Sequence, residues 1–386
     1  MDIQRKIAII GSGISGITAA YLLDKRFDIT LFESNETIGG HTHSHQINNE
    51  LFVDMGFIVF NHLNYPLFTR FLNQLNVDYQ DSDMSFGYYN KEKNFYYSSD
   101  FPKGIFAQKK NIFSYSYIKF LKEINTFNKQ VLSDIDSKAL KDKNLIQYLE
   151  SLNLSKRLIQ TYILPMGAAI WSCPTSQIEL FPAESFFNFW KNHQLLTIGK
   201  RPVWKTITNA SQSYIKKFKD TFTGTIKTNT PILSVSTNNN HCEITTHSQN
   251  VLIFDNVIIA THADQAYKLL KHPTQLQTEL LKPWQYSKNN ISLHTDETVM
   301  PPNKNAWASW LVQQRKNDID QLTMTYYMNR LQSIKSKHHY FVTLNDKANI
   351  DPNKMIKNIT FSHPIYDLKS VQTQQSLYQL NTGPLY

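Results

Sequence analysis

The sequence has little of what builds disulfide-rich or membrane-spanning proteins. Its 386 residues include two cysteines, Cys173 and Cys242, which are too few for a disulfide scaffold and are typical of a reducing compartment. No apolar run approaches the roughly 20 residues that cross a bilayer. The first apolar stretch, Ile7 to Ile10, is followed directly by glycine. It is therefore too short for a secretory signal and is typical of a strand. We therefore expect a cytoplasmic protein, either free or at the inner face of a membrane.

What is present predicts a globular protein with a substantial core. Hydrophobic residues make up 41% and aromatic residues 13% of the chain, a composition that excludes a disordered or collagen-like protein. At roughly 150 residues per domain, the length predicts two or three domains.

Positive charge is concentrated in the middle of the chain. Basic residues outnumber acidic ones by 40 to 31, and residues 100–220 hold 18 basic and 9 acidic side chains. Such a segment attracts anionic surfaces or a phosphorylated substrate, although an ordinary solvated face also explains it. It is compatible with peripheral membrane contact through residues 100–220. Nucleic-acid binding is not expected, because no recognition motif accompanies the basic residues.

The stretch KIAIIGSGISGITAAYLLDKRFDITLFES has the pattern of one βαβ unit. A strand at Ile7 to Ile10 is followed by a glycine turn, an amphipathic helix and a strand at Ile29 to Glu33. The first glycine allows the sharp turn, the second lets backbone amides approach a pyrophosphate, and the third lets the helix lie close to the strand. The predicted nucleotide loop is Gly11, Ser12, Gly13, Ile14, Ser15 and Gly16.

Glu33 ends the second predicted strand, 22 residues after Gly11. At this position its carboxylate can accept hydrogen bonds from both hydroxyls of an adenosine ribose, whereas a 2′-phosphate would be repelled. We therefore predict that Glu33, with the adjacent Ser34, binds an adenine dinucleotide other than NADP.

A second glycine motif follows in ESNETIGGHTHSH, where Gly39 and Gly40 precede His41 and Thr42. Together with the later VDMGFIVF (Val53 to Phe60), it resembles the FAD-dependent amine oxidase and phytoene desaturase superfamily. In that superfamily the glycine pair lies against the flavin pyrophosphate, so the resemblance implies FAD contacts from these four residues. The superfamily usually has arginine after the glycines, and this chain has His41.

A closer resemblance extends along nearly the whole chain, to bacterial predicted NAD/FAD-binding amine-oxidase-like proteins. It implies an α/β fold with a discontinuous Rossmann-like FAD-binding domain of the GR2 type and an inserted α+β substrate domain. We expect residues 1–65 and 201–265 in the first domain, and residues 66–200 and 266–386 in the second. The motifs that carry the resemblance are GHTHSH, DMGFIVFN, LPMGAAIWS, FPAESFFNFWKNHQLL, RPVWKTI, IIATHADQA, LHTD and AWASW.

Periodicity predicts the elements between these motifs. Residues 66–200 are expected to be mainly helical, as in SYIKFLKEINTFNKQVL, whose apolar residues have helical spacing. Strands are predicted at Thr225 to Val235, Cys242 to Thr246 and Asn256 to Thr261, and aromatic, β-branched stretches between Tyr286 and Val342 predict a sheet in the substrate domain.

Three further residues are implied to contact FAD. By the resemblance, Ile232 follows Pro231 at the place where relatives put backbone against adenine, although Ile232 would also be a buried strand residue. Ala260 and Thr261 end a predicted strand at the carboxyl edge of the sheet, where ligands of open α/β folds bind. A simple strand-to-helix turn explains them equally well.

The histidines and cysteines of the chain do not predict a metal site or a flavin linkage. His41, His43 and His45 alternate and would share one face of a strand, but no nearby carboxylate or cysteine pair completes a metal set. Cys173 lacks the motif of a flavin-linked thiol. We expect FAD to be bound non-covalently and no metal.

The catalytic residue is not identified by the sequence, and three candidates remain. Trp171 follows Gly167-Ala168-Ala169, small residues that allow a flat ring to approach or simply pack between helices. Lys288 lies two residues before Asn290, the position equivalent to a lysine that holds a water near flavin N5 in some relatives. His294 is either an acid or base or a structural histidine.

Two departures from the resemblance concern glycine and length. Asn209-Ala210-Ser211 stands where relatives usually have Gly-Gly-Ser close to the flavin. Relatives also continue beyond the point equivalent to NTGPLY, and Leu385 and Tyr386 match the first residues of their next strand. We expect a truncated product or fragment, with an intact adenosine half and an incomplete isoalloxazine half of the FAD site.

The expected activity is hydride transfer from a substrate C–H bond to flavin N5, catalysed by an FAD-dependent oxidoreductase. The aromatic and basic character of the middle region favours a lipid-like substrate over a small polar amine. Two alternatives remain open: a flavin-dependent isomerase, and a non-catalytic relative that binds lipid or a lipidated partner.

Overall fold

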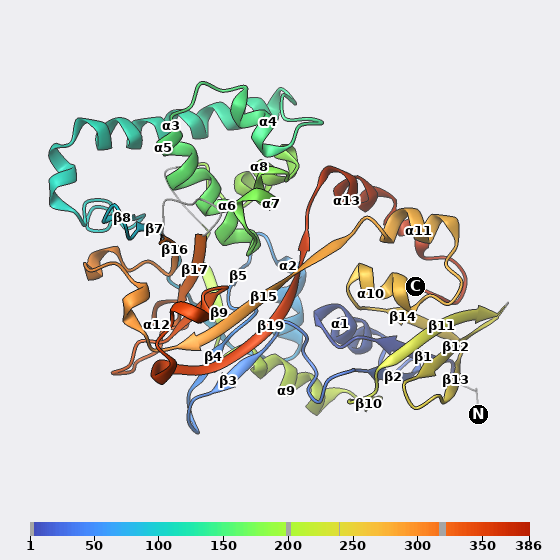
Figure 1. Cartoon of the computed structure of the whole chain (residues 1–386). Coiled ribbons are helices and arrows are strands. Elements are labelled where there is room, and N and C mark those ends of the chain that lie inside the picture. The colour runs from blue at the N-terminus through green and yellow to red at the C-terminus, as the bar shows by residue number, and fades with distance from the viewer. Residues whose placement is uncertain (1–3, 198–201, 239, 316–321) are drawn as a thin grey trace.

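The computed structural model describes residues 4–197, 202–238, 240–315 and 322–386. Figure 1 shows a parallel sheet with its helices in one half of the molecule, a larger mixed sheet in the other half, and a layer of helices above the mixed sheet. The chain is of the mixed α/β class, as predicted. The expected domain boundary at residues 200 and 201 lies outside the described residues, and the domain division stays a prediction.

The parallel sheet has the strand order β10-β2-β1-β14. The predicted βαβ unit is confirmed, because helix α1 connects the parallel neighbours β1 and β2, and Ile9 and Leu31 are fully buried in register with each other. Leu385 extends the sheet by a parallel bridge to Val257 of β14. The elements are β1 (Lys6–Ile10), α1 (Ile14–Leu23), β2 (Asp28–Phe32), β10 (Thr225–Lys227) and β14 (Asn256–Ile259).

Both faces of the parallel sheet are covered. On one face, apolar side chains of β1 and β2 pack with helices α1, α2 (Pro66–Gln74) and α9 (Gln212–Thr221). On the other, Ala8, Ile10 and Phe32 pack against the antiparallel sheet β11-β12-β13. Its strands are β11 (Ile232–Asn238), β12 (His241–Thr246) and β13 (Val251–Phe254).

The single strand predicted from Thr225 to Val235 is wrong. It is two strands, β10 and β11, in two different sheets. Asn229 has a left-handed backbone with φ of 48°, and Pro231 lacks an amide hydrogen for a ladder. The chain therefore leaves one sheet and enters the other between these residues.

The mixed sheet has seven strands in the order β19-β15-β18-β17-β16-β7-β8. The sheet predicted between Tyr286 and Val342 is confirmed, and it recruits two strands from early in the chain and one from late in it. The prediction of a mainly helical segment from residue 66 is confirmed at α2 but is wrong from Phe86 to Ser98, where aromatic strands such as FGYYN pair with each other and with β16. The strands are β7 (Phe86–Asn90), β8 (Phe95–Ser98), β15 (Gln285–His294), β16 (Trp310–Gln314), β17 (Leu322–Tyr327), β18 (Phe341–Leu344) and β19 (Met355–Ile365).

The helical layer follows β8 and is built around one aromatic core. Ser114 caps the first helix by accepting a hydrogen bond from the amide of Tyr117. The predicted apolar face is confirmed, since Tyr117, Phe120, Phe127 and Val131 are buried in the same core as Trp190. The helices are α3 (Tyr115–Asp136), α4 (Leu145–Glu150), α5 (Lys156–Leu158), α6 (Leu164–Trp171), α7 (Thr175–Glu179) and α8 (Ala183–Asn192).

Short elements connect these layers. Strands β3 and β4 form a hairpin after the second glycine motif, and β5, β9 and β6 form a small sheet. Within the described ranges, no helix is both long and apolar enough to cross a membrane. The connecting elements are β3 (Ser44–Gln46), β4 (Phe52–Asp54), β5 (Phe60–Asn61), β6 (Tyr79–Asp81), β9 (Trp204–Ile207), α10 (Ala263–Leu269), α11 (Gln275–Leu281), α12 (Met328–Leu331) and α13 (Leu368–Thr373).

Candidate functional site

The first glycine motif forms a tight turn at the carboxyl end of β1. Gly11 has a left-handed φ of 99°, and a Cβ at this residue would lie 2.8 Å from the carbonyl oxygen of Ala260. A Cβ at Gly16 would lie only 1.9 Å from the carbonyl oxygen of Gly11. In contrast, a Cβ at Gly13 would have no neighbour within 4 Å. Packing therefore requires glycine at Gly11 and Gly16, whereas open space lies beside Gly13, before α1.

The second glycine motif lies directly against the first. Gly40 has a φ of 58°, and a Cβ on it would lie 3.0 Å from Cα of Gly13. The amide of Gly39 donates a hydrogen bond to the carbonyl of Ser12 at 3.0 Å. We call Gly11 to Gly16 together with Gly39 and Gly40 the glycine edge. A side chain on Gly11, Gly16, Gly39 or Gly40 would meet neighbouring backbone, so the two glycine motifs pack closely together here.

Glu33 follows β2 and is nearly fully buried beside this edge. Its Oε2 accepts hydrogen bonds from the amide and hydroxyl of Ser12, and its Oε1 accepts from Ser34 Oγ (3.1 Å) and from the amide and side chain of Asn35 (2.9 and 2.7 Å). Burial raises the pKa of Glu33, but the bonds from Ser12 and Asn35 lower it by more, so the pKa lies below its ordinary value. The carboxylate is ionised, and a ribose hydroxyl would exchange with one of these donors.

The structure brings the other cofactor candidates to the same edge. The amide of Thr230 donates to the carbonyl of Glu33 at 2.9 Å, which places the start of β11 next to the carboxylate. Thr42 closes the glycine-pair turn through its amide and bonds Tyr214 through its hydroxyl at 2.5 Å. The predicted residues at or beside the edge are Gly11, Ser12, Gly13, Ile14, Ser15, Gly16, Glu33, Ser34, Gly39, Gly40, His41, Thr42, Ile232, Ala260 and Thr261.

A cluster of rings borders the glycine edge at His41. The ring of His41 lies 5.5 Å from that of His262, which follows β14, and 5.3 Å from that of His363 on β19 (centroid distances). Phe361 lies 4.7 Å from His41, and Tyr286 stacks on His262 at 4.4 Å. We call these five residues the ring cluster. It joins the parallel sheet to the mixed sheet.

The three histidines of the ring cluster are uncharged at neutral pH. Burial lowers the pKa of each ring. For His363, burial and the neighbouring His41 and His262 together lower the pKa to about 4. His41 Nε2 bonds the carbonyl of Ser362 at 3.1 Å, and His363 Nδ1 accepts from the buried Asn289 side chain at 2.7 Å. The cluster therefore presents neutral, flat surfaces beside the glycine edge.

The two polar catalytic candidates lie on β15, which also carries Tyr286 of this cluster. Lys288 is exposed on β15, whereas the next residue, Asn289, is buried against His363. His294 is fully buried within the mixed sheet, with Nε2 bonded to Thr343 Oγ1 at 2.8 Å and Nδ1 accepting from the amide of Asp296. Burial lowers the pKa of His294 to about 4. Both nitrogens are occupied, and the ring has the environment of a structural histidine.

Trp171 lies in the aromatic core of the helical layer. Its ring contacts those of Phe181 and Phe186 at 4.4 and 4.8 Å. A Cβ at Gly167 would lie 2.8 Å from the same Phe186 ring. Close packing between helices accounts for the small residue and the tryptophan.

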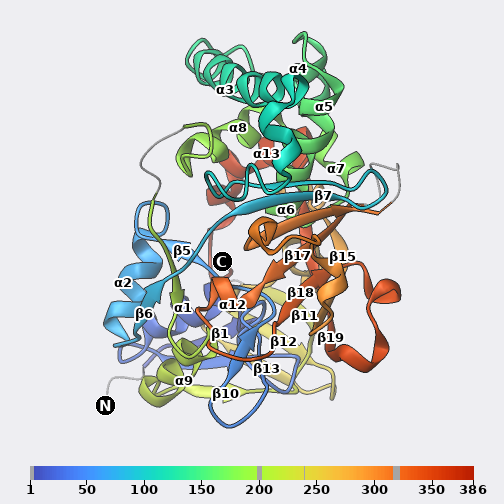
Figure 2. The same ribbon diagram turned by 90° about the vertical axis from the view of Figure 1, so that its left-hand side faces the viewer.

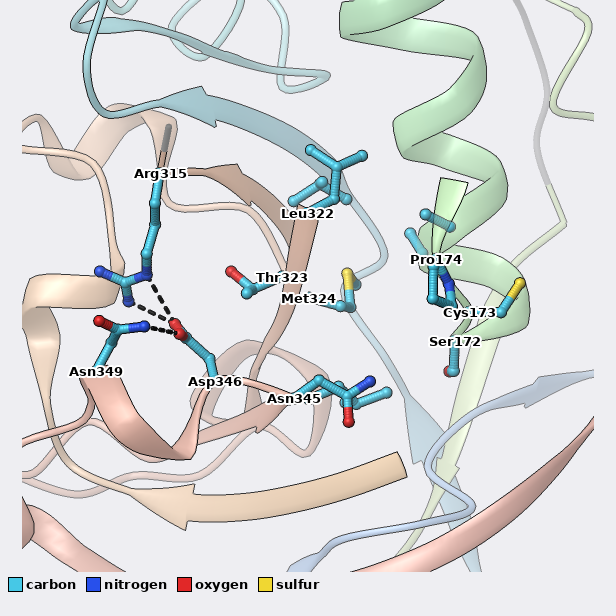
Figure 3. A pocket seen from close by; sticks show the side chains of 14 residues that line it. Ser172, Cys173, Pro174, Arg315, Leu322, Thr323, Met324, Asn345, Asp346 and Asn349 are labelled. Atoms are coloured by element: carbon cyan, nitrogen blue, oxygen red, sulfur yellow. Dashed lines mark hydrogen bonds and ion pairs between the residues drawn. The ribbon is translucent and has the colours of Figure 1, made fainter. Parts of the chain in front are cut away.

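A cavity of about 330 Å³ lies between the end of α6 and the mixed sheet (Figure 3). Ala168 and Ala169 line it from the helix, and Val312, Met324 and Leu344 line it from the sheet. Its polar wall is an ion pair, in which Arg315 Nε and Nη2 both bond Asp346 Oδ2 at 2.9 and 2.5 Å, while Asn349 bonds Oδ1 at 2.6 Å. One side of the cavity is thus apolar. The other side is polar, and its two opposite charges pair with each other.

The apolar wall of this cavity packs against strand β4 and the residue that follows it. Ala169, Val312 and Met324 pack in one apolar cluster with Val53 and Met55. Cys173 also lines the cavity, and burial raises the pKa of its thiol to about 12. The thiol is therefore protonated and unreactive at neutral pH.

Asp54 is a fully buried carboxylate that ties the β3–β4 hairpin to the start of α9 and to Gln332 after α12. It accepts hydrogen bonds from the amide (3.0 Å) and hydroxyl (2.6 Å) of Ser211, from Ser44 Oγ at 2.5 Å and from Gln332 Nε2 at 3.2 Å. Burial raises the pKa of Asp54 to about 6, against the opposing effect of these hydrogen bonds. Removing the carboxylate would leave several buried donors without an acceptor.

Asn209 and Ala210, which precede Ser211, have left-handed backbones with φ of 61° and 70°. Asparagine tolerates this conformation, but the Cβ of alanine clashes with its own backbone there. The glycines that the resemblance places here would be unstrained. Ala210 is therefore a strained residue beside Asp54.

We expect Ala210→Gly to stabilise the protein. Relief of the left-handed strain contributes about 1 to 2 kcal/mol, and the greater freedom of glycine in the unfolded chain offsets about 0.4 to 1 kcal/mol of it. The net gain in the free energy of unfolding is about 0.5 to 1 kcal/mol, measured by urea denaturation. Ala139→Gly, at a position for which no left-handed φ is recorded, is the matched control and should destabilise. A loss of stability in Ala210→Gly would contradict the strain.

Among the described residues, no group of three histidine, cysteine, aspartate or glutamate side chains is placed to hold a metal ion. His43 precedes β3 and His45 lies within it. Burial lowers the pKa of both rings. They form part of the hairpin that follows the glycine edge.

The sequence did not single out His363, Asn289, Tyr286 or Phe361 as site residues. Each of them lies far along the chain from the glycine motifs. The hydrogen bond between His41 and the Ser362 carbonyl, for example, joins residues that are 321 positions apart. The one local signal is the alternation FSHPI in β19, which puts Phe361 and His363 on one face.

Comparisons with known proteins agree with this geometry. A protein-family model described as flavin containing amine oxidoreductase matches residues 14–358. Among curated proteins, a search finds no significant match. A putrescine oxidase variant has a structure similar to this chain, with a TM-score of 0.72 and 12% identity, covering 100% of this chain and 92% of that one.

Two further solved structures share the fold. A putative protoporphyrinogen oxidase from Exiguobacterium sp. 255-15 has a TM-score of 0.68 and 13% identity, covering 99% and 93% of the two chains. Cyclohexylamine oxidase from Brevibacterium oxydans IH-35A has a TM-score of 0.66 and 12% identity, covering 99% and 92%. The family implies a flavin cofactor and an oxidoreductase type of enzyme. The chain belongs to the flavin-containing amine oxidoreductase family.

Proposed function

We propose that this chain binds FAD non-covalently at the glycine edge and oxidises a C–H bond of an amine or a lipid-like molecule. The observation that carries the proposal is the open space at Gly13, where a Cβ would meet no atom within 4 Å although Gly11 and Gly16 are tightly packed. A pyrophosphate fits at such a place, because the amides that begin α1 point toward it. Glu33 supplies the acceptor for an adenosine ribose.

When bound, FAD supplies at its N5 atom the acceptor for a hydride from the substrate. The chain contributes position and a dry environment. His41, His262 and His363 are neutral, so the ring cluster adds flat surfaces without charge beside the glycine edge. The Asn289 side chain donates a hydrogen bond to Nδ1 of His363, which fixes the orientation of the His363 ring. The cysteines support non-covalent binding, since burial raises the pKa of both thiols.

The cavity beside α6 is our candidate for the substrate site. Its volume of about 330 Å³ is at the lower end for a small-molecule pocket. The apolar wall suits an alkyl or aromatic group, and the Arg315–Asp346 pair offers both a positive and a negative group to a polar end of the substrate. Since solved structures of this fold include putrescine, cyclohexylamine and protoporphyrinogen oxidases and a fatty acid isomerase, amines and fatty acids form the first substrate panel.

The absorption spectrum of the purified chain tests this proposal. We expect a yellow protein, or one that becomes yellow on incubation with FAD, and release of the flavin into the supernatant when the protein is denatured. Under anaerobic conditions, a substrate from the panel should bleach the flavin bands, and air should restore them. A colourless protein that cannot be loaded with FAD would refute the cofactor assignment.

The same experiment separates oxidation from isomerisation. The isomerase alternative is retained because a fatty acid isomerase from P. acnes shares the fold, with a TM-score of 0.62 and 12% identity. Conversion of a fatty acid without consumption of oxygen or lasting bleaching would favour the isomerase. Stoichiometric bleaching by a substrate would favour the oxidase.

A further inference from the structure

The segment between β8 and the body of α3 exposes large apolar side chains. Phe101 is 78% exposed, Phe113 92% and Tyr115 83%, and Ile112 is also exposed. Such residues normally contribute to a core, and a group of them at one end of a molecule marks an interaction site. Figure 2 looks onto this end, where the segment leads into α3.

The segment is firmly held, so these side chains are not exposed by local unfolding. The hydroxyl of Tyr117 donates to the carbonyl of Ile105 at 2.7 Å, and the Phe106 ring packs against Tyr117 at 6.3 Å. The Gln108 side chain donates to the carbonyl of Asn94 at 2.7 Å. The backbone from residue 100 to residue 117 thus has a fixed path that directs the apolar residues outward.

The charge of this segment has one sign. Residues 101–122 contain five lysines and no acidic residue. Lys103, Lys109, Lys110 and Lys119 are exposed. The neighbouring Asp100 is occupied by Arg330, whose Nη1 bonds it at 2.7 Å. The lysines of this segment therefore have no acidic neighbour in sequence between residues 101 and 122.

We propose that this surface docks the protein on an anionic lipid bilayer. We define the docking surface as Phe101, Ile112, Phe113 and Tyr115 together with Lys103, Lys109, Lys110 and Lys119. Phenylalanine and tyrosine insert at the level of the headgroups, while lysines pair with anionic lipids above them. A nucleic acid would satisfy the lysines but would leave Ile112 and the tips of the aromatic residues without an apolar environment. The proposal does not depend on flavin binding.

Vesicle flotation with the whole chain tests the proposal. We expect the protein to float with vesicles of phosphatidylcholine and phosphatidylglycerol, and to stay in solution with phosphatidylcholine alone or in high salt. Lys109→Gln with Lys110→Gln should lower the partition coefficient about 25-fold, because each lysine near the surface contributes about fivefold. Phe101→Ser with Phe113→Ser should lower it at least tenfold.

Matched variants elsewhere on the surface provide the controls. Lys216→Gln with Lys217→Gln removes two exposed lysines of α9, and Val251→Ser with Ile253→Ser removes two exposed apolar residues of β13. Both controls should bind vesicles as the unmodified chain does. In Phe113→Trp, the added tryptophan should shift its emission to shorter wavelength on anionic vesicles.

Three outcomes would overturn the proposal. They are equal loss of binding in the control and docking-surface variants, absence of vesicle binding by the unmodified chain, and binding to single-stranded DNA that is tighter than to vesicles and is lost in the same variants. None of them bears on the flavin spectrum, so failure here is distinguishable from failure of the proposed function. Circular dichroism and the urea midpoint confirm that each variant is folded.

Discussion

Gly16→Ala is expected to lower the free energy of unfolding by about 3 kcal/mol or more. The new Cβ would lie 1.9 Å from the carbonyl oxygen of Gly11. Relief requires that α1 move away from β1, and overpacking of a core contact with backbone on both sides is at the upper end of such costs. Urea denaturation followed by circular dichroism measures the effect. A variant as stable as the unmodified chain would show that α1 and β1 are less closely packed than we find.

Gly13→Ala is the matched substitution in the same turn, with the opposite expected pattern. Its Cβ meets no atom within 4 Å, so we expect a stability change below about 1 kcal/mol, from the less favourable N-cap alone. Flavin affinity should fall at least tenfold, because the methyl group occupies the space that we assign to the pyrophosphate. If Gly13→Ala binds FAD as tightly as the unmodified chain, that assignment is wrong.

Acid is expected to destabilise the protein through the ring cluster. The pKa of His363 is lowered from 6.5 to about 4 in the folded state. Its contribution to stability is therefore fully present above pH 6.5 and is lost as the pH falls toward 4. The loss is about 3 kcal/mol for His363 alone, and His41 and His262 shift in the same direction. Unfolding free energies measured from pH 7 to pH 4 give this slope.

His363→Asn isolates the contribution of this ring. The amide oxygen of asparagine replaces Nδ1 as the acceptor for Asn289, but it does not titrate in this range. We expect the decline between pH 6.5 and pH 4 to be smaller by about 3 kcal/mol in this variant. His338→Asn, at an exposed position, should leave the decline unchanged. An equal decline in the unmodified chain and in His363→Asn would contradict the assignment.

The βαβ unit was predictable because its determinants are local. Turn chemistry at Gly11 and Gly16, apolar periodicity and an acidic strand end at Glu33 all lie within 33 consecutive residues, and each permits one local structure. The same holds for α3, where helical spacing of apolar residues predicted the buried face. Local patterns of this kind determine the structure of a segment without partners from distant parts of the chain.

Other parts were not predictable, since the deciding partners are far away in sequence. The stretch FGYYN becomes β7 by pairing in parallel with β16, more than 200 residues later. Asn289 and Lys288 are adjacent, and only the position of β19 decides that Asn289 faces His363. In LPMGAAIWS, small residues predict equally a ligand contact and helix packing. The Phe186 ring accounts for Gly167 by packing, whereas Ala168 and Ala169 line the cavity.

The pairing of β1 with β14 also sets the order of events during synthesis. Lys6 and Asp255, which bond at the end of this pair, are separated by 249 residues. At about 5 to 20 residues per second, a ribosome needs about 12 to 50 s to add them. During that time β1 and β2 lack their neighbours β14 and β10, so the two outer edges of this strand pair stay unpaired. We expect a nascent chain of this protein to depend on chaperones until residue 259 has left the ribosome.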